Sequence, residues 1–337
     1  MELIDGYDHR PGSHCGAGAL RNVTAYYDLN YSEAACFGIG GGAAFVRYTR
    51  PDRPWATFRA SPTWLEQAFF ERLGIPHTFR AGDDFETAWA NVTDRIDDGD
   101  PSMLFLDPAN LDYLAEGPAH VSPHVAVVIG YGDETVRLSD ASLPSPEEVS
   151  RETLRDAWHS DRLVPLENEH LAVTRARERE QGNDAAAAGL RQAATYMLTP
   201  LAVKRDARGP GEEGLPALRS FGEDLERWAN DPDVARQARA ARRSIDEHGE
   251  GAAFRDLFAE SLAELGQRTG LPRELADRMA AVGAEWRSVA ARLEDVADHD
   301  EPPTGSLSEA ASLVADIADQ EEAVFSTLRE ELGGHGE

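Results

Sequence analysis

The sequence has very little lysine, little cysteine and no long apolar run. Lys204 is the single lysine among 337 residues, and Cys15 and Cys36 are the two cysteines. Two cysteines are too few for a disulfide scaffold or a four-cysteine zinc site. No apolar run approaches the roughly 20 residues of a membrane-spanning helix, and the acidic start of the chain is the reverse of a secretory signal. We therefore expect a cytoplasmic protein with no membrane partner.

Acidic residues dominate the charge. The chain has 61 Asp and Glu against 33 Lys and Arg, a formal net charge of −28. Residues 1–175 hold 28 acids and 14 bases, and residues 176–337 hold 33 and 19, so each part nets −14. This even spread, with arginine in place of lysine, favours adaptation of the whole surface to high salt, in a halophilic source. A GC-rich coding bias could also deplete lysine, but it would not supply the acids. Nucleic acid is not an expected partner, because phosphate binding needs a basic face.

The length favours two domains of different character. Before residue 175, β runs at 102–107, 124–131 and 135–140 alternate with short helical patterns. After about residue 183 the chain is alanine-rich and helix-periodic, and we expect no strand there. We therefore predict an α+β domain over 1–172 and an all-helical domain over 183–335. The predicted helices of the second domain cover residues 183–198, 214–231, 233–246, 254–268, 272–297 and 306–332.

Cys15 is the first candidate for chemistry. It follows the loop residues Pro11 and Gly12, and a helical pattern runs on from it, so we expect it in the first turn of a helix. The N–H groups and the dipole at a helix N-terminus favour an anion, and so favour the thiolate that acts as a nucleophile. The alternative is a small buried cysteine without chemistry.

His124 and Asp140 are the second and third candidates. His124 opens one predicted strand, and Asp140 closes the next. If the loop between them is centred on Gly132, residues whose numbers sum to 264 face one another, and His124 lies directly opposite Asp140. The carboxylate then holds one ring nitrogen and leaves the other as a base. Alternatively, these are a strand-end histidine and a turn-capping aspartate.

A cysteine at a helix N-terminus, followed by a histidine and an acid on two later strands, is the order found in papain-like cysteine enzymes. The stretch from His14 to Tyr48 also resembles the N-terminal domain of the butirosin-biosynthesis protein H (BtrH) family. The resemblance lies in the His14–Cys15 pair, in Glu33, and in the glycine-rich segment 37–42 that runs into aromatic residues. Residues 124–142 resemble the family's histidine and aspartate strands, and the second half resembles the helical domain that often follows.

The resemblance implies a papain-like fold and acyl transfer from a carrier-protein thioester to an amine. By position, Cys15 is then the nucleophile, His124 the base and Asp140 the residue that orients it. The glutamine that papain-like peptidases place six residues before the cysteine is His9 here. The residues of the oxyanion hole are therefore not fully assigned. The Cys15 N–H is one donor, and His9 and His14 are candidates for the second.

Further candidates surround this site. Gly40 and Gly41, in the run 38–42, could wrap a phosphate or pantetheine arm, or form a tight turn against the catalytic helix. Glu33 could bind a substrate amine or anchor that turn. Histidines and cysteines occur without the spacing of a metal motif, although His120 and Cys36 are ligand types, so we expect no metal and no cofactor.

One basic face stands out in the second half. Arg236, Arg239 and Arg243 recur at helical spacing, which predicts either docking of an acidic carrier protein or a solvated face paired with nearby acids.

The functional hypothesis is a cysteine-dependent acyltransferase that uses a carrier-protein donor and a small amine acceptor. An amidase or peptidase is the alternative, because the same three residues serve both reactions. A non-catalytic binding protein on the same scaffold is the third reading.

The charge gives a first prediction. In dilute buffer the net charge of −28 is unscreened, so structure should be lost there and recovered in molar salt. Circular dichroism across a salt titration measures this. An unchanged spectrum and melting temperature across that range would contradict halophilic adaptation.

Overall fold

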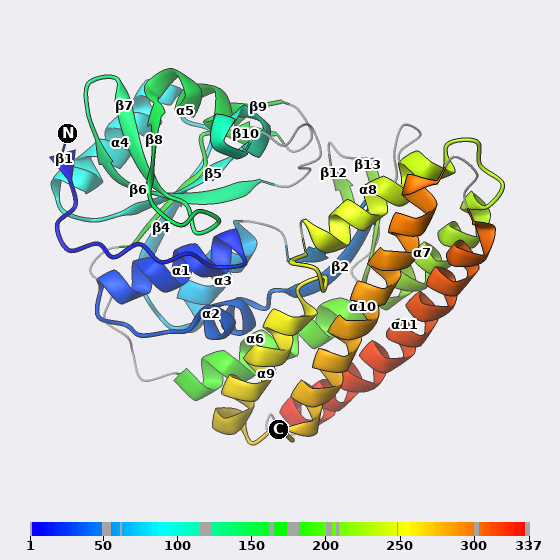
Figure 1. Cartoon of the computed structure of the whole chain (residues 1–337). Helices are drawn as coiled ribbons and strands as arrows, with labels where there is room; N and C mark the ends of the chain where they lie inside the picture. Colours follow the sequence, from blue (N-terminus) through cyan, green and yellow to red (C-terminus); the bar gives the residue numbers. More distant parts are fainter. Residues whose placement is uncertain are drawn as a thin grey trace. The chain divides into compact units, whose positions relative to one another are not determined.

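The computed structural model describes residues 2–48, 55–60, 63–114, 123–161, 165–173, 182–199, 204–206, 209–247, 249–299 and 303–333. The chain forms two compact units. Unit 1 comprises residues 1–40 and 61–185, and unit 2 comprises residues 41–60 and 186–337. The chain therefore crosses between the units three times. Figure 1 shows the elements of each unit by label and colour.

Unit 1 combines helices with an antiparallel sheet. Its helices are α1 (Cys15–Tyr26), α2 (Glu33–Gly40), α3 (Trp64–Arg72), α4 (Phe85–Asp97) and α5 (Arg151–Trp158), with short 3-10 turns η1 (Pro108–Asn110) and η2 (Asp112–Leu114). Its strands are β1 (Glu2–Leu3), β4 (His77–Arg80), β5 (Ser102–Leu106), β6 (His124–Tyr131), β7 (Thr135–Ser139), β8 (Glu147–Ser150), β9 (His159–Ser160), β10 (Leu166–Glu167) and β11 (His170–Val173).

The main sheet of unit 1 has the strand order β4-β11-β5-β6-β7-β8, with β1 paired to β6. The central strands β5 and β6 are buried along most of their length, as their apolar sequences predict. Helix α4 packs on β5 and β6, α5 packs on β5, and α1 packs on β6. The sheet therefore gives a rigid support to His124, the first residue of β6.

Unit 2 is mainly helical. Its helices are α6 (Gly182–Leu198, which begins in unit 1), α7 (Gly214–Trp228), α8 (Val234–Asp246), α9 (Arg255–Thr269), α10 (Glu274–Asp298) and α11 (Thr304–Gly333). Each predicted helix of the second half is present within a few residues of its expected ends. The predicted fold class, an α+β part followed by a helical part, is confirmed.

The expectation that no strand occurs after residue 183 is wrong. Strands β12 (Lys204–Asp206) and β13 (Gly209–Glu213) form a hairpin, and β13 pairs with β2 (Ala43–Tyr48), which pairs with β3 (Trp55–Arg59). Two distant segments thus build one sheet in unit 2. For this reason the compact units differ from the contiguous ranges 1–172 and 183–335: residues 41–60 belong to unit 2. The expected junction falls partly on residues 174–181, outside the described residues.

A fully buried ion pair fixes this sheet to the helices. Arg255, at the start of α9, and Glu321, in α11, each have no exposed surface. The Arg255 Nε and Nη2 atoms donate to the two Glu321 oxygens at 2.7 and 3.1 Å. Nη1 donates to the carbonyl oxygens of Ala44, Phe58 and Ala253. One guanidinium therefore joins β2, β3, α9 and α11.

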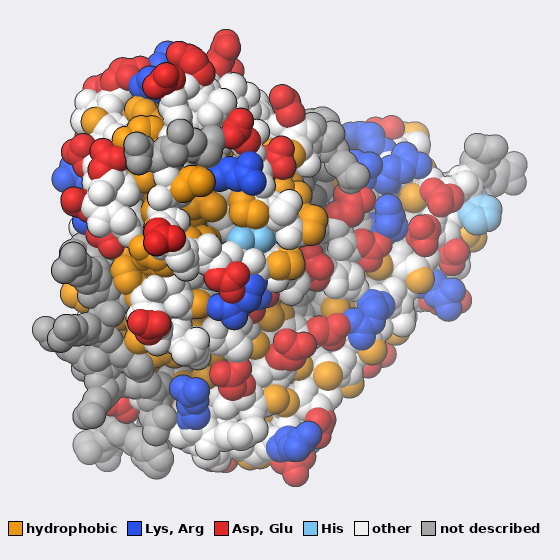
Figure 2. All heavy atoms as spheres, turned by 60° about the vertical axis from the view of Figure 1, so that its left-hand side comes forward, with side chains coloured by type: hydrophobic (Ala, Val, Ile, Leu, Met, Phe, Trp, Pro, Cys, Tyr) orange, Lys and Arg blue, Asp and Glu red, His pale blue; other side chains and the backbone are white. Residues whose placement is uncertain are grey.

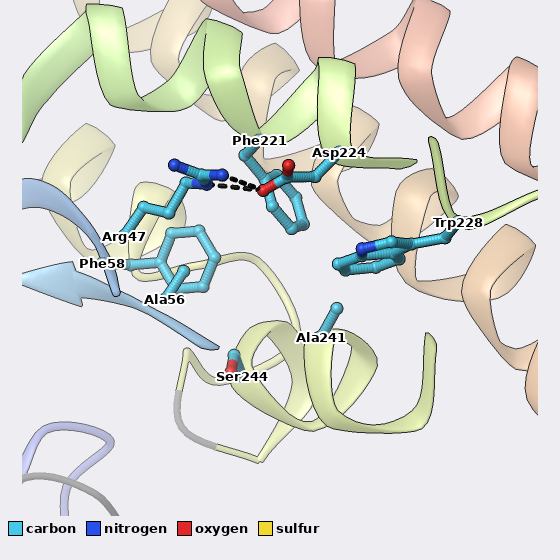
Figure 3. A pocket seen from close by; sticks show the side chains of 8 residues that line it. All are labelled: Arg47, Ala56, Phe58, Phe221, Asp224, Trp228, Ala241 and Ser244. Carbon is cyan, nitrogen blue, oxygen red and sulfur yellow. Dashed lines mark hydrogen bonds and ion pairs between the residues drawn. The ribbon is translucent and has the colours of Figure 1, made fainter. Parts of the chain in front are cut away.

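A second ion pair lies beside a small cavity of unit 2. The Arg47 Nε on β2 donates to Asp224 Oδ2 on α7 at 2.6 Å, and both residues are buried. Figure 3 shows this pair above the rings of Phe58, Phe221 and Trp228, which line the cavity with Ala56, Ala241 and Ser244. The cavity volume is about 10 Å³, the space of one water molecule. It is a packing defect of the core, too small for a substrate.

The surface matches the even charge of the sequence. On the face shown in Figure 2, acidic side chains are scattered among basic and apolar ones and do not gather in one patch. Within the described residues, no helix is long and apolar enough to cross a membrane.

The Arg255–Glu321 pair gives a second prediction. Glu321→Gln leaves the buried guanidinium without its counter-charge, which should lower the free energy of unfolding by about 3–5 kcal/mol. The adjacent Glu322→Gln is the control. It removes an exposed contact with Arg219 and should cost about 0.5 kcal/mol or less. Urea unfolding followed by circular dichroism measures both. Equal losses in the two variants would contradict the assigned role of the buried pair.

Candidate active site

Cys15 is the first residue of α1, as the sequence predicts. The preceding residue, His14, caps the helix: its backbone is extended, and its Nδ1 accepts the N–H of Ala17 at 3.0 Å. The Cys15 side chain is half-buried, whereas Cys36 lies fully buried in α2. Cys15 therefore has both the helix-terminal position and the access that a nucleophile needs.

Glu33 holds the loop that leads into Cys15. Its Oε1 accepts the backbone N–H groups of Ser13 and His14 at 2.8 and 2.7 Å, and its Oε2 accepts Arg21 at 3.1 Å. A Cβ atom on Gly12 would lie 2.4 Å from Glu33 Oε2, so a larger residue there would displace the carboxylate. Both carboxylate oxygens are thus engaged within the protein. Of the two roles expected for Glu33, these contacts favour the anchor, at the loop before Cys15, over binding of a substrate amine.

The same loop is bound to the segment that carries Asp140. The Gly12 N–H donates to Ala141 O at 2.7 Å. A Cβ atom on Gly18 of α1 would lie only 2.6 Å from the Ala141 Cβ. This close approach brings the end of β7 to the start of α1.

His9 strengthens this junction. Its two ring nitrogens contact Ser139 Oγ at 2.8 Å and Leu143 O at 3.0 Å. A carbonyl only accepts, so Nε2 carries the proton and Nδ1 accepts from Ser139. His9 has no N–H left for an oxyanion. His14 accepts through Nδ1, so its Nε2 carries the proton, and its role as the second oxyanion donor stays a prediction. The expectation of an oxyanion donor at His9 is therefore corrected to a structural role.

His124 and Asp140 are in direct contact. The His124 Nε2 lies 2.7 Å from Asp140 Oδ2, and both side chains are buried. The predicted register between their strands is wrong, however: Val127 pairs with Ser139 and Val128 with Leu138, so the paired numbers sum to 266. A register irregularity follows between Val128 and Gly130. The two residues are therefore diagonal neighbours. A register shift of two residues leaves both side chains on the same face of the sheet. The predicted contact between them therefore still forms.

The other side of His124 faces Cys15, and the two side chains form a hydrogen bond. Because Asp140 binds Nε2, the nitrogen that faces the thiol is Nδ1. Burial lowers the pKa of His124, but the negative charges of Asp140 and Cys15 outweigh burial and raise that pKa to about 10. The imidazole is thus protonated at neutral pH beside Cys15, which favours the thiolate form of that side chain.

Asp140 is surrounded by hydrogen-bond donors. Its Oδ1 accepts the backbone N–H of Ser142 at 2.9 Å, and its Oδ2 accepts the Tyr113 hydroxyl at 3.1 Å as well as His124. Burial raises the pKa of Asp140, but the charge of His124 and these hydrogen bonds outweigh it and hold the pKa below its usual value. Tyr113 was not foreseen, because it lies in a short 3-10 turn with no sequence motif.

The glycine-rich segment does not form a ligand loop. Residues 37–40 complete helix α2, and Gly38, Gly40 and Gly41 are buried. A Cβ atom on Gly40 would lie 2.8 Å from Leu65 of α3, and Gly41 adopts a φ of 73° just after the helix. The expectation that Gly40 and Gly41 wrap a phosphate or pantetheine arm is corrected: one packs between helices, and the other turns the chain.

The arginines of α8 are engaged within unit 2. Arg236 pairs with Asp233 at 2.6 Å, Arg243 pairs with Glu247 at 3.5 Å, and Arg239 donates to Ala297 O at 2.7 Å. These contacts favour the interpretation of the arginines as a solvated helix face paired with nearby acceptors, over a docking site for a carrier protein.

No cluster of three His, Cys, Asp or Glu residues suited to a metal ion occurs in the part of the chain that the structure describes. His120, considered above as a ligand type, lies outside that part.

Two protein families match this chain. The model of the family "Butirosin biosynthesis protein H, N-terminal" matches residues 14–141. The model of the domain of unknown function DUF4872 matches residues 152–328. A solved structure described as a C39-like peptidase from Bacillus anthracis is 14% identical, with a TM-score of 0.36, and the match covers 52% of this chain and 98% of that one. No curated protein matches.

The contact between His124 and Cys15 gives a third prediction. At pH 7 iodoacetamide should alkylate Cys15 much faster than the buried Cys36. The pKa of about 10 keeps His124 protonated from neutral pH to about pH 10. The alkylation rate of Cys15 should therefore stay high over that range. In His124→Ala the thiolate loses its cation, and a thiol near the ordinary pKa of roughly 8.5 should react about tenfold more slowly at pH 7.

Peptide mass spectrometry of both cysteines over time measures these rates. His159→Ala, at an exposed histidine, is the control and should react like the unsubstituted protein. Equal, slow labelling of both cysteines would remove the nucleophile assignment.

Proposed function

We propose that this chain, which belongs to the DUF4872 family over its larger C-terminal part and is similar to the butirosin biosynthesis protein H family over residues 14–141, is a cysteine-dependent acyltransferase. The donor would be an acyl or aminoacyl thioester on a carrier protein, and the acceptor a small amine. The observation that carries the proposal is the continuous contact from Asp140 through His124 to Cys15 at the N-terminus of α1.

In the first half-reaction, the Cys15 thiolate attacks the thioester carbonyl. The carbon–sulfur bond to the donor breaks, and the proton of the His124 imidazolium moves to the departing thiolate of the donor. The acyl group is then a thioester on Cys15. The N–H of Cys15, at the start of α1, supports this step by donating to the oxyanion.

In the second half-reaction, the amine nitrogen attacks the acyl group on Cys15. The neutral imidazole of His124 takes the proton that the nitrogen loses, and Cys15 leaves as a thiolate. The thiolate–imidazolium pair is thereby restored. Asp140 stays deprotonated throughout: it accepts the hydrogen bond from Nε2 and stabilises the imidazolium.

Hydrolysis differs only in the second nucleophile, because water can take the place of the amine. The acyltransferase is preferred because acyl transfer is what the resemblance to the butirosin biosynthesis protein H family implies, and the amidase or peptidase is the alternative outcome of the test below. A non-catalytic protein on this scaffold would show no covalent adduct at all.

The proposed mechanism gives a fourth prediction. With an acyl thioester of N-acetylcysteamine as donor, Cys15 should carry the acyl group, visible as a mass increase of the intact protein. Cys36→Ala should still form the adduct, and Cys15→Ala should not. His124→Ala should slow turnover by about 10²–10⁴-fold, and Asp140→Asn should remain folded and impaired, because its role is to orient and stabilise the ring.

An added primary amine distinguishes the two reactions. It should discharge the Cys15 adduct faster than water does if the protein is a transferase. Discharge at the same rate with and without the amine indicates a hydrolase. An adduct on Cys36, or undiminished turnover in Cys15→Ala, would overturn the assignment of Cys15.

A further inference from the structure

Two donors share one oxygen of Asp140. The His124 Nε2 and the Tyr113 hydroxyl both contact Oδ2, at 2.7 and 3.1 Å, while Oδ1 is bound by the Ser142 N–H. The carboxylate side chain has no exposed surface. Its orientation is therefore fixed by three donors from three separate segments: strand β6, turn η2, and the backbone that follows β7.

The fold holds Tyr113 in place independently of Asp140. Turn η2 follows η1, and Asp107 fixes η1: its carboxylate accepts the Ala109 N–H at 3.0 Å and the Ser160 hydroxyl at 2.6 Å. The Tyr113 ring packs against the apolar core that includes Leu106. Tyr113 thus presents its hydroxyl from a rigid support, so it can position the carboxylate rather than follow it.

Tyr113 acts as a neutral donor. Burial and the negative charge of Asp140 raise the pKa of Tyr113 far above its usual value, so the hydroxyl keeps its proton. The charged groups around the contact are His124, Cys15, Asp140 itself and Glu147 of β8. Two donors on one acceptor oppose each other: the bond from Tyr113 is stronger when the imidazole is neutral, because the carboxylate charge is then less neutralised.

We infer that Tyr113 is a positioning residue of the proposed active site. By donating to the same oxygen as His124, it fixes the orientation of Asp140 and limits how tightly that carboxylate holds the imidazole proton. The inference rests on the proposed function where it concerns turnover, and on geometry alone where it concerns the proton of His124. It adds a fourth member, from the β5–β6 connection, to the Cys15–His124–Asp140 set.

The fifth prediction tests this role with Tyr113→Phe, which keeps the ring and removes the hydroxyl. Without the competing donor, Asp140 binds the imidazolium more strongly. The titration midpoint of His124 should rise by about half a pH unit, which is roughly threefold in proton affinity. NMR titration of the histidine ring signals measures it, and the spectrum of His124→Ala identifies the signal. With a thioester donor, kcat should fall about tenfold and KM should stay unchanged.

Tyr131→Phe is the matched control. Its hydroxyl also donates to a carboxylate, Asp97 Oδ1 at 2.7 Å, but at an exposed site, so neither the His124 midpoint nor kcat should change. Should Tyr113→Phe fail to fold, 3,5-difluorotyrosine at position 113 gives the opposite test: a stronger donor should lower the His124 midpoint.

The outcomes separate the two proposals. An unchanged or lowered His124 midpoint in folded Tyr113→Phe overturns the role of Tyr113, whatever the turnover. A raised midpoint in a protein that forms no Cys15 adduct supports Tyr113 and rejects acyl transfer.

Discussion

The buried carboxylate of Asp140 is the constraint on which the candidate site depends. A carboxylate without exposed surface is stable only when hydrogen bonds and a positive charge replace the lost water. Three donors do this here, and one of them, the His124 imidazolium, also supplies the positive charge. The same requirement fixes the chemistry, because the carboxylate keeps His124 protonated and turned with Nδ1 toward Cys15. The hydrogen bonds and charge that stabilise the buried carboxylate therefore also place a protonated imidazole beside Cys15, as the proposed mechanism requires.

Cys15 is placed by the backbone around it more than by its own side chain. Glu33 binds the N–H groups of the two preceding residues, and Gly18 lets the helix approach Ala141 more closely than any side chain would allow. The start of α1 is thereby held against the end of β7. Because proton transfer depends on sub-ångström geometry, these contacts matter to the proposed chemistry, although none of them involves the side chain of Cys15 or His124.

Some of this site was predictable and some was not. The helix at Cys15 and the strands of His124 and Asp140 follow from local patterns, and their shared face survived a register error because a shift of two residues preserves the side. Tyr113 and the role of Glu33 depend on contacts between segments far apart in sequence, which no local pattern encodes. The strands at 43–59 and 204–213 were missed for the same reason: the Gly- and Pro-rich β13 pairs with β2, and buried Arg255 holds β2 and β3.

This arrangement ties the two units together through the chain itself. In the sequence, residues 41–60 come between helices α2 and α3 of unit 1. Their strand β2 nevertheless pairs with β13, and the carbonyl groups of Ala44 and Phe58 accept hydrogen bonds from Arg255 of unit 2. A chain cut after residue 172 would keep β2 and β3 but lose β13 and Arg255. It would also lose Phe221 and Trp286, whose ring centroids lie 6.1 and 6.5 Å from that of Phe45. The buried apolar side chains and the carbonyl groups of β2 and β3 would then be exposed to water, directly after helix α2 in the sequence. The helical part is therefore a structural requirement of the segment that follows α2, whatever further role it has in binding a donor or an acceptor.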